Sequence, residues 1–353
     1  MSLRDDLVAQ IAASGPISLS EFMTQALLHP TKGYYSTRDP LGVAGDFTTA
    51  PEISQMFGEL IGLSLAQSWL DQGAPSHFVL AELGPGRGTL MADILRATAK
   101  VPGFHTAAQI VLVEASPVLA EVQRKTLEQF KVAIVDSFAR VPDGPLWLVA
   151  NEFFDALPIR QFQRDGKAWR ERCVGLEEDT LVFGLSPIGP QPALDHRLED
   201  TKDGDLVELC PQATPITRDI GARVAADGGA ALVIDYGDWR SLGDTFQALH
   251  AHQTVTPFDA PGNADLTAHV DFEALSVAAA PATFTRLTPQ GVFLERLGIT
   301  TRAQTLAKDL SGAALDAHIA AHQRLTHPQE MGNLFKVLGL YPANAAPPPG
   351  LEP

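Results

Sequence analysis

Apolar runs of strand length recur along the chain and alternate with segments of helical periodicity. The runs occupy residues 78–83, 109–114, 132–135, 146–150 and 230–235. Within each run the apolar residues are almost continuous, which is typical of strands buried on both faces of a parallel sheet. Because helical segments separate the runs, the pattern predicts an α/β fold with a doubly wound, mostly parallel sheet.

Helical patterns dominate the chain before the first of these runs. Ser18 and Glu21 have the spacing of a capping box, and apolar residues follow them at helical intervals. A second helical pattern covers residues 52–70. Residues 29–51 between them are rich in glycine and aromatic residues and have no periodicity, which indicates a working loop that covers a ligand.

A more polar insertion interrupts the strand–helix alternation after the fourth run. Asp165-Gly166 within the insertion is a strong hairpin turn signal, so we expect an inserted antiparallel lobe there. The last residues are rich in proline and alanine and predict a flexible tail. We expect four units. The helical extension with its covering loop is residues 1–75, and the core consists of residues 76–156 and 210–340. The inserted lobe is residues 157–209, and the tail is residues 341–353.

The charge balance is strongly acidic, with 26 Lys and Arg against 42 Asp and Glu and a net charge of −16. This excess disfavours nucleic acid and anionic membranes as partners. No apolar run is long enough to cross a bilayer, so we expect no stable membrane insertion, and no secretory signal is evident. The two cysteines, Cys173 and Cys210, lack metal-ligand spacing. These features predict a cytoplasmic protein without a bound metal.

The segment Glu82–Leu90, E-L-G-P-G-R-G-T-L, directly follows the first apolar run. Its three alternating glycines would let the backbone approach a ligand at the amino end of a helix: Gly84, Gly86 and Gly88. Dinucleotide sites use G-x-G-x-x-G, in which Thr89 would be a glycine, so an NAD-linked dehydrogenase is disfavoured. With an acidic residue two places before the first glycine, the segment resembles motif I of S-adenosylmethionine (SAM)-dependent methyltransferases. A plain tight turn between strand and helix is the alternative.

Polar residues also end the next two runs. Glu114 ends the second run, where a carboxylate beside the crevice of a doubly wound sheet can accept both ribose hydroxyls. Hydrogen bonds to a charged group contribute roughly 1.5–3 kcal/mol each. Asp136 and Ser137 follow the third run, where they could accept a hydrogen bond from the amino group of adenine. Solvated acids at strand ends are the alternative interpretation.

The fourth run ends in N-E-F-F-D, an unusual group of polar and aromatic residues. Asn151 also fits the cap of a following helix. Glu152 and Asp155, with Asp235 at the end of the fifth run, are carboxylates expected at the same edge of the sheet. Aromatic rings beside a sulfonium could add about 0.5–2 kcal/mol of cation–π attraction. The rings available are Phe47, Phe153 and Phe154, for which core packing is equally open.

Several longer strings strengthen the resemblance, because they occur together and in one order. They are G-D-F-T-T-A-P-E-I-S-Q-M-F-G-E, the glycine segment, A-N-E-F-F-D-A-L-P, V-I-D-Y-G, A-D-L-T-A-H-V-D-F and E-M-G-N-L-F-K-V-L. From about residue 17 to 340 the chain resembles the MidA family of SAM-dependent methyltransferases. The resemblance implies a Rossmann-like class I methyltransferase core that binds SAM. For the mitochondrial members it implies symmetric dimethylation of arginine on a core subunit of respiratory complex I, in support of its assembly.

The resemblance also implies roles for individual residues. SAM would be held by Gly45, Asp46, Phe47, Glu82, Gly84, Gly86, Gly88, Glu114, Asp136, Ser137 and Asn151. The acceptor would face Asn151, Glu152 and Asp155, with Asp235 as a further acid. An arginine acceptor needs such carboxylates, because its guanidinium is charged at physiological pH and must lose a proton on methylation.

The acceptor itself is less defined by the sequence. Residues 248–259 are rich in histidine where a basic segment is expected, which leaves the substrate open. A complex I subunit is the protein partner that the resemblance implies. A small-molecule acceptor and a non-catalytic assembly factor are the alternatives, and the sequence predicts no particular oligomeric state.

Overall fold

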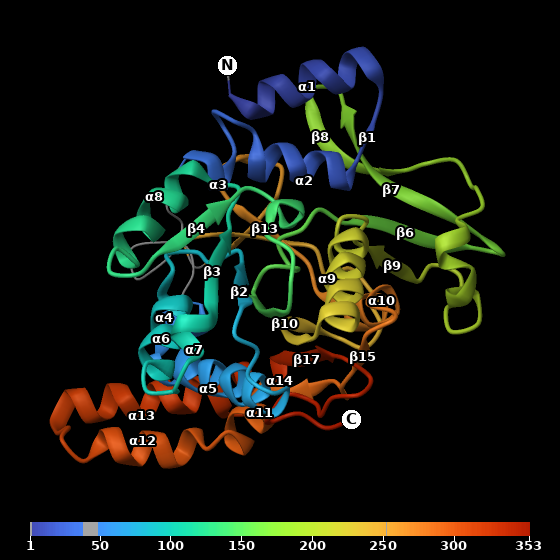
Figure 1. The fold of residues 1–353 in the computed structure, drawn as a ribbon. Coiled ribbons are helices and arrows are strands. Elements are labelled where there is room, and N and C mark those ends of the chain that lie inside the picture. Colours follow the sequence, from blue (N-terminus) through green and yellow to red (C-terminus); the bar gives the residue numbers. More distant parts are fainter. Residues whose placement is uncertain (1, 38–48, 252) are drawn as a thin grey trace.

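A nine-stranded sheet forms the centre of the computed structural model, which describes residues 2–37, 49–251 and 253–353. Its main strand order is β4-β3-β2-β5-β10-β17-β15 (Figure 1). The parallel strands are β2 (Phe78–Leu83), β3 (Ala108–Val113), β4 (Val132–Val135), β5 (Leu146–Asn151) and β10 (Gly229–Asp238). β17 (Phe335–Tyr341) runs antiparallel to β10. The predicted doubly wound, mostly parallel sheet is confirmed.

Short strands complete this sheet at its antiparallel side. β14 (Val270–Asp271) pairs with β10, while β15 (Thr283–Phe284) and β16 (Thr288–Pro289) pair with β17. The strand order reverses direction between β2 and β5, since β3 and β4 lie on one side of β2 and β10 lies beyond β5. In open α/β sheets ligands bind in the crevice at such a reversal, outside the carboxyl ends of the strands.

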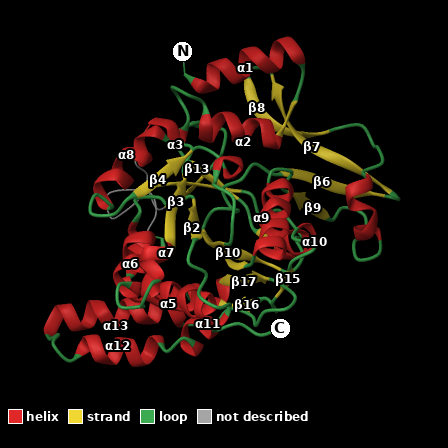
Figure 2. Cartoon of the chain, viewed as in Figure 1, coloured by secondary structure: helices red, strands yellow, loops and turns green. Residues whose placement is uncertain are grey.

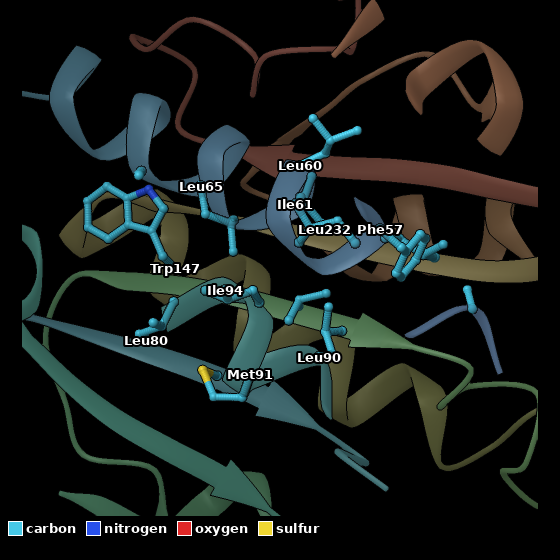
Figure 3. Packing of buried hydrophobic residues seen from close by; sticks show 14 of the residues in the cluster. Phe57, Leu60, Ile61, Leu65, Leu80, Leu90, Met91, Ile94, Trp147 and Leu232 are labelled. Carbon is cyan, nitrogen blue, oxygen red and sulfur yellow. The ribbon is translucent and has the colours of Figure 1, made fainter. Parts of the chain in front are cut away.

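Helices cover both faces of the sheet. One face packs against α5 (Gln55–Asp71) and α6 (Thr89–Thr98), whose apolar side chains meet those of β2, β5 and β10 (Figure 3). The other face packs against α9 (Ala213–Asp227) and α10 (Phe272–Ala278). Gly62 permits the close approach of α5 to α6, because a Cβ there would lie 2.9 Å from the Cα of Ile94. The alternation of strands and helices is visible in Figure 2.

Most of the other helices lie around this core. They are α3 (Tyr34–Thr37), α4 (Ala50–Ile53), α7 (Phe104–Ala107), α8 (Pro117–Thr126), α11 (Gln290–Arg296), α12 (Ile299–Ala307), α13 (Gly312–Thr326) and α14 (Met331–Leu334), with 3-10 turns at Phe138–Arg140 and Pro192–Leu198. α12 and α13 form a hairpin at one end of the molecule (Figure 1). No helix in the described ranges is long and apolar enough to cross a membrane.

The inserted lobe is an antiparallel sheet, as predicted. It contains β6 (Arg160–Asp165), β7 (Ala168–Glu177), β8 (Thr180–Leu185) and β9 (Leu206–Leu209). The hairpin turn between β6 and β7 places Gly166 at φ +62°, a backbone conformation that favours glycine. A separate small sheet consists of β11 (Gln247–His250), β12 (Gln253–Val255) and β13 (Asp265–Thr267).

The helical extension joins the lobe and does not stand apart from it. α1 (Leu3–Ser14) and α2 (Leu19–Leu28) flank β1 (Ile17–Ser18), which pairs with β7 as a further strand of the lobe sheet (Figure 1). The predicted capping box is confirmed, because the Glu21 amide donates to Ser18 Oγ at 3.1 Å and the Ser18 amide donates to Glu21 Oε2 at 2.9 Å.

The C-terminal segment corrects one prediction. Residues 341–353 were expected to be a flexible tail, but Leu351 is only 7% exposed and belongs to the main apolar core. Ser64 Oγ donates to the carbonyl of Pro349 at 2.8 Å, and Arg296 pairs with Glu352 at 2.9 Å. Proline- and alanine-rich composition predicted disorder, whereas one buried leucine and these polar contacts hold the segment against the core.

Candidate functional site

A cavity of about 1360 Å³ lies at the carboxyl edge of the parallel sheet. The ends of β2, β3 and β5 and the residues that follow β4 line one side of it. β11 and β13 line another side, and α2, α9 and the segment from the end of α13 to the start of β17 contribute further lining residues. The strand ends that the sequence singled out therefore open into one space.

The glycine turn that follows β2 lines the cavity. Gly84 and Gly86 line it and have positive φ angles of +60° and +53°. A Cβ on Gly84 would lie 2.9 Å from the ring of Phe153. Gly88 does not line the cavity; at φ +82° it caps the amino end of α6, so its role is the turn itself.

Glu82 lies at the end of β2 beneath this turn. It is 2% exposed and lines the cavity, and its Oε2 has no hydrogen-bond partner within residues 2–37, 49–251 and 253–353. Burial, together with the nearby Glu114, raises the pKa of Glu82 to about 8. An uncompensated buried carboxyl oxygen is costly, so this atom suits a hydrogen-bond donor from a ligand.

Glu114 follows the end of β3, and a residue that the sequence analysis missed holds it in place. Gln123 on α8 donates from Nε2 to Glu114 Oε2 at 2.9 Å and to the carbonyl of Gly86 at 2.8 Å. The amide of Ser116 donates to Glu114 Oε1 at 2.7 Å. Gln123 is fully buried one turn after Leu119. A glutamine on the apolar face of a predicted helix was the signal that could have found it.

Asp136 and Ser137 line the cavity beyond β4, at a more open position. The Asp136 side chain is 64% exposed and pairs with Arg140 at 2.9 Å. Ser137 Oγ donates to Asp136 Oδ1 at 3.2 Å. Their contact with adenine stays a prediction. This side of the cavity is also accessible to solvent.

Asn151 and Glu152 end β5 at the middle of the cavity edge. Asn151 donates from Nδ2 to Glu152 Oε1 at 3.0 Å, while its own Oδ1 is buried and accepts no hydrogen bond from the residues that the structure describes. The amide of Ala50 also donates to Glu152 Oε1, at 3.1 Å. Burial raises the pKa of Glu152 to about 7, and the nearby Asp155 adds to this shift.

The backbone of Glu152 is strained. Its φ is +52°, which costs a non-glycine residue on the order of 1–3 kcal/mol, and such residues cluster at active sites. Its amide still donates to the carbonyl of Ile234 at 2.9 Å, which anchors the turn to β10. The strain places consecutive side chains of the N-E-F-F-D string at the cavity: Asn151, Glu152 and Phe153.

Asp155 and Asp235 occupy different places, although both were predicted to face the acceptor. Asp155 lines the cavity and is 6% exposed, and no residue in the described part of the chain forms a hydrogen bond with its Oδ1. Asp235 is fully buried and does not line the cavity. Its Oδ2 accepts the amides of Phe154 at 3.0 Å and Asp155 at 3.2 Å. The structure therefore corrects Asp235 from a reacting acid to a positioning residue that holds the turn.

The two phenylalanines of the N-E-F-F-D string also lie in different environments. Phe153 lines the cavity and packs over Gly84, whereas Phe154 is 3% exposed within the core. The predicted covering residues lie outside the described part of the chain: Gly45, Asp46 and Phe47. Glu52 lines the cavity after them and accepts a short hydrogen bond from the hydroxyl of Thr89.

The donor and acceptor groups of the cavity fit SAM. Glu82 Oε2, Asn151 Oδ1 and Asp155 Oδ1 are buried acceptors that have no hydrogen-bond partner among the described residues, which suits a ligand that carries ammonium and sulfonium charges. Gly84 and Gly86 line the cavity with backbone in a conformation that favours glycine. Glu114, oriented by Gln123, offers a carboxylate for ribose hydroxyls.

Comparison with known proteins agrees with this geometry. A family model described as "Putative S-adenosyl-L-methionine-dependent methyltransferase" matches residues 60–290. The proteins named protein arginine methyltransferase NDUFAF7, mitochondrial, are similar to the chain. The relative from Mus musculus is 39% identical over 95% of this chain and 83% of its own length. The relative from Homo sapiens is 37% identical over 95% of this chain and 82% of its own length.

A solved structure extends the agreement to the fold and the ligand. A protein from Burkholderia thailandensis, crystallised with bound S-adenosyl-homocysteine, superposes with a TM-score of 0.83 at 30% identity. The match covers 96% of this chain and 91% of the other. Since family model, relatives and solved structure agree with a glycine cradle at the edge of a doubly wound sheet, the chain belongs to the MidA-like family of S-adenosyl-L-methionine-dependent methyltransferases.

Proposed function

We propose that the protein is a protein-arginine N-methyltransferase that forms symmetric dimethylarginine on a subunit of respiratory complex I and so supports assembly of the complex. The observation that carries the proposal is the pair of acids after β5, Glu152 and Asp155, beside the cofactor cradle. The relatives named protein arginine methyltransferase cover nearly the whole chain, which supports the same acceptor chemistry.

In this proposal one part of the cavity binds SAM and the other binds the acceptor. When bound, SAM supplies an electrophilic methyl group on its sulfonium. Glu82, Gly84, Gly86 and Glu114 hold it at the cradle, and Asp136 and Ser137 lie at its adenine end. Gly45, Asp46 and Phe47 are proposed to cover its methionine end. Alignment of donor and acceptor accounts for most of the rate, since well-oriented reactants gain roughly 7–11 kcal/mol.

An arginine acceptor must also lose a proton, and the acids after β5 can accept it. A guanidinium nitrogen that gains a methyl group must release one proton, because the product would otherwise carry an additional charge. Glu152 has a pKa raised to about 7 by burial, so it exchanges a proton readily near neutral pH. Asn151 and the Ala50 amide orient its carboxylate at 3.0 Å and 3.1 Å.

The size of the cavity leaves room for an acceptor side chain beside SAM. Pockets for small ligands usually enclose about 300–1,000 Å³. The cavity of about 1360 Å³ exceeds this range, and it continues from the cradle to the α13–β17 segment. The bacterial cytoplasm is the location we propose, whereas the curated relatives are named as mitochondrial.

Quantitative mass spectrometry of arginine methylation, with and without the gene, tests the proposal. We expect one dominant symmetric dimethylarginine site on a respiratory-chain subunit to disappear with the gene and to return with the wild-type copy. A Glu152→Gln copy should not restore it. An unchanged arginine methylome, in cells whose purified protein binds SAM, would overturn the arginine acceptor and leave the small-molecule acceptor and the non-catalytic assembly factor as the alternatives.

A further inference from the structure

The string E-M-G-N-L-F-K-V-L holds the end of α13 beside the cavity. Within it Gly332 lies against the carbonyl of Thr326, because a Cβ on this glycine would be 2.1 Å from that oxygen. Gly291 on α11 approaches the same carbonyl, where its Cβ would be 2.3 Å away. The fully buried Gln290 donates from Nε2 to the carbonyl of Leu325 at 3.0 Å. Two close contacts and one buried hydrogen bond therefore fix the last turn of α13.

Arg324 lines the cavity from this turn. Ala320 and Gln323 of the same helix line it too, whereas Leu325 is fully buried in the core. Arg324 is exposed, and the ion pairs formed among residues 2–37, 49–251 and 253–353 do not include it. Because an arginine side chain is always charged, α13 brings one fixed positive charge to the cavity.

Most other charged side chains on the described lining are acids. The arginines of this lining are Arg87 in the glycine turn and Arg324, and the lining contains no described lysine. The charge of Arg324 acts on Glu152, whose pKa it lowers against the effect of burial. Arg324 therefore lies on the side of the cavity formed by the end of β5.

The packing of α13 agrees with this position. α13 packs against α4, the helix whose Ala50 amide donates to Glu152 Oε1 at 3.1 Å. Glu52 on α4 lines the cavity and accepts a hydrogen bond from the hydroxyl of Thr89, which follows the glycine turn. α13 and α4 thus bring one cation and one anion, Arg324 and Glu52, to the side where the glycine turn meets the end of β5.

The methionine part of SAM requires both charges. It carries an α-ammonium and an α-carboxylate, and a carboxylate that leaves bulk water needs a cation or N–H donors. In the proposed arrangement adenine lies near the residues after β4, and ribose lies near Glu114 after β3. Since the strand order continues from β3 to β2 and β5, the methionine part comes to the glycine turn and the end of β5. The acids there suit its ammonium, and its carboxylate needs a cation.

We infer that Arg324 is a cofactor-positioning residue that binds the carboxylate of the methionine part of SAM. A planar guanidinium can donate two parallel hydrogen bonds to one carboxylate, which gives orientation as well as affinity. The clamp formed by Gly291, Gly332 and Gln290 fixes the helix turn from which this guanidinium reaches the cavity. The inference uses the SAM dependence of the family and is independent of the acceptor that is methylated.

The experiment measures binding of SAM and of decarboxylated SAM to the full-length protein by isothermal titration calorimetry. Decarboxylated SAM keeps the adenosine, the sulfonium and the amine, and lacks only the carboxylate. Wild type should bind SAM at least about tenfold more tightly than the decarboxylated form. Arg324→Gln should weaken SAM about tenfold or more and should change the affinity for decarboxylated SAM by less than about twofold. Arg324→Lys keeps the charge and should retain part of the preference.

One further variant and one control separate charge from folding. Ala320→Glu places a carboxylate four residues before Arg324 on the same helix, where it pairs with the guanidinium and competes with the cofactor. It should weaken SAM relative to decarboxylated SAM, and its exposed position lets it carry the test if Arg324→Gln does not fold. Lys308→Gln, an exposed position between α12 and α13, removes the same charge away from the described lining and should match wild type.

The outcomes distinguish this inference from the proposed function. Selective loss of SAM affinity in Arg324→Gln supports the carboxylate contact, and it does so even if an unchanged arginine methylome overturns the arginine acceptor. Equal weakening of both ligands overturns the contact, as does a preference that survives both Arg324→Gln and Ala320→Glu. Loss of the preference in Arg87→Gln alone overturns it and moves the contact to the glycine turn. Equal binding of SAM and decarboxylated SAM by wild type also overturns it.

Discussion

Gln123 donates a hydrogen bond from its side-chain amide to the carboxylate of Glu114, with Nε2 and Oε2 2.9 Å apart. The same nitrogen bonds to the carbonyl of Gly86 at 2.8 Å. One buried side chain therefore links the two parts of the proposed cofactor cradle, the glycine turn after β2 and the acid after β3.

Replacement of Gln123 by methionine should weaken SAM binding by about 1–2 kcal/mol, because the carboxylate and the glycine turn lose a shared hydrogen-bond donor. Isothermal titration calorimetry with SAM measures this loss. Gln129→Met, at an exposed position beyond the same helix, is the matched control. Unchanged affinity of Gln123→Met would mean that the turn and Glu114 are held without it.

Glu114→Gln should reduce SAM affinity further, by about 1.5–3 kcal/mol, since the amide replaces a charged acceptor of ribose hydroxyls by a neutral group. Equilibrium binding of SAM checks the change. Glu121→Gln, whose carboxylate is 57% exposed on α8, should bind SAM as wild type does. A Glu114→Gln protein with full affinity would remove the ribose contact from the assignment.

The stability of the ligand-free protein should fall as pH rises from about 5 to 8. Burial raises the pKa of Glu82 to about 8, of Glu152 to about 7 and of Asp155 to about 6. Each folded pKa exceeds its unfolded value, so the native state binds more protons than the unfolded chain across this window. The stabilisation is complete below the unfolded values and is lost as pH passes each folded value.

Differential scanning calorimetry over this pH range measures the effect. Glu82→Gln removes the group with the highest pKa of the three and should flatten the decline of Tm between about pH 6 and 8. Glu121→Gln should keep the wild-type slope. A Tm that rises with pH through this window would contradict the burial of these acids in the native state.

Gly62→Ala should destabilise the fold by about 1–3 kcal/mol, because the added methyl group overpacks the contact between α5 and α6. The new Cβ would lie 2.9 Å from the Cα of Ile94. Urea unfolding followed by circular dichroism measures the loss. Gly184→Ala in β8 is the control, since a Cβ there meets nothing within 4 Å.

Leu351→Ala should lower the free energy of unfolding by about 2–4 kcal/mol, the cost of truncating a buried leucine. A flexible C-terminal segment would show no such loss. The control is Asn344→Ala, an exposed position in the same segment. Both variants can be compared by urea unfolding under the same conditions.

Much of the site was predictable from local patterns. Continuous apolar runs separated by helices specify a parallel sheet, and the carboxyl ends of its strands must meet at one edge. Glu82, Glu114 and Glu152 were therefore expected together, and they line one cavity.

The sequence by itself determined the α/β class, the glycine turn and the acids at the strand ends, because these follow from periodicity and from the conformations that glycine allows. Only the tertiary structure decided that Asp235 holds the turn from below, that Gln123 orients Glu114 and that Asp265 meets Tyr35. Those relationships join residues far apart in the chain, from Tyr35 to Asp265 above all. Burial and hydrogen bonding between such residues depend on how helices and strands pack, and no local pattern of polarity encodes that packing.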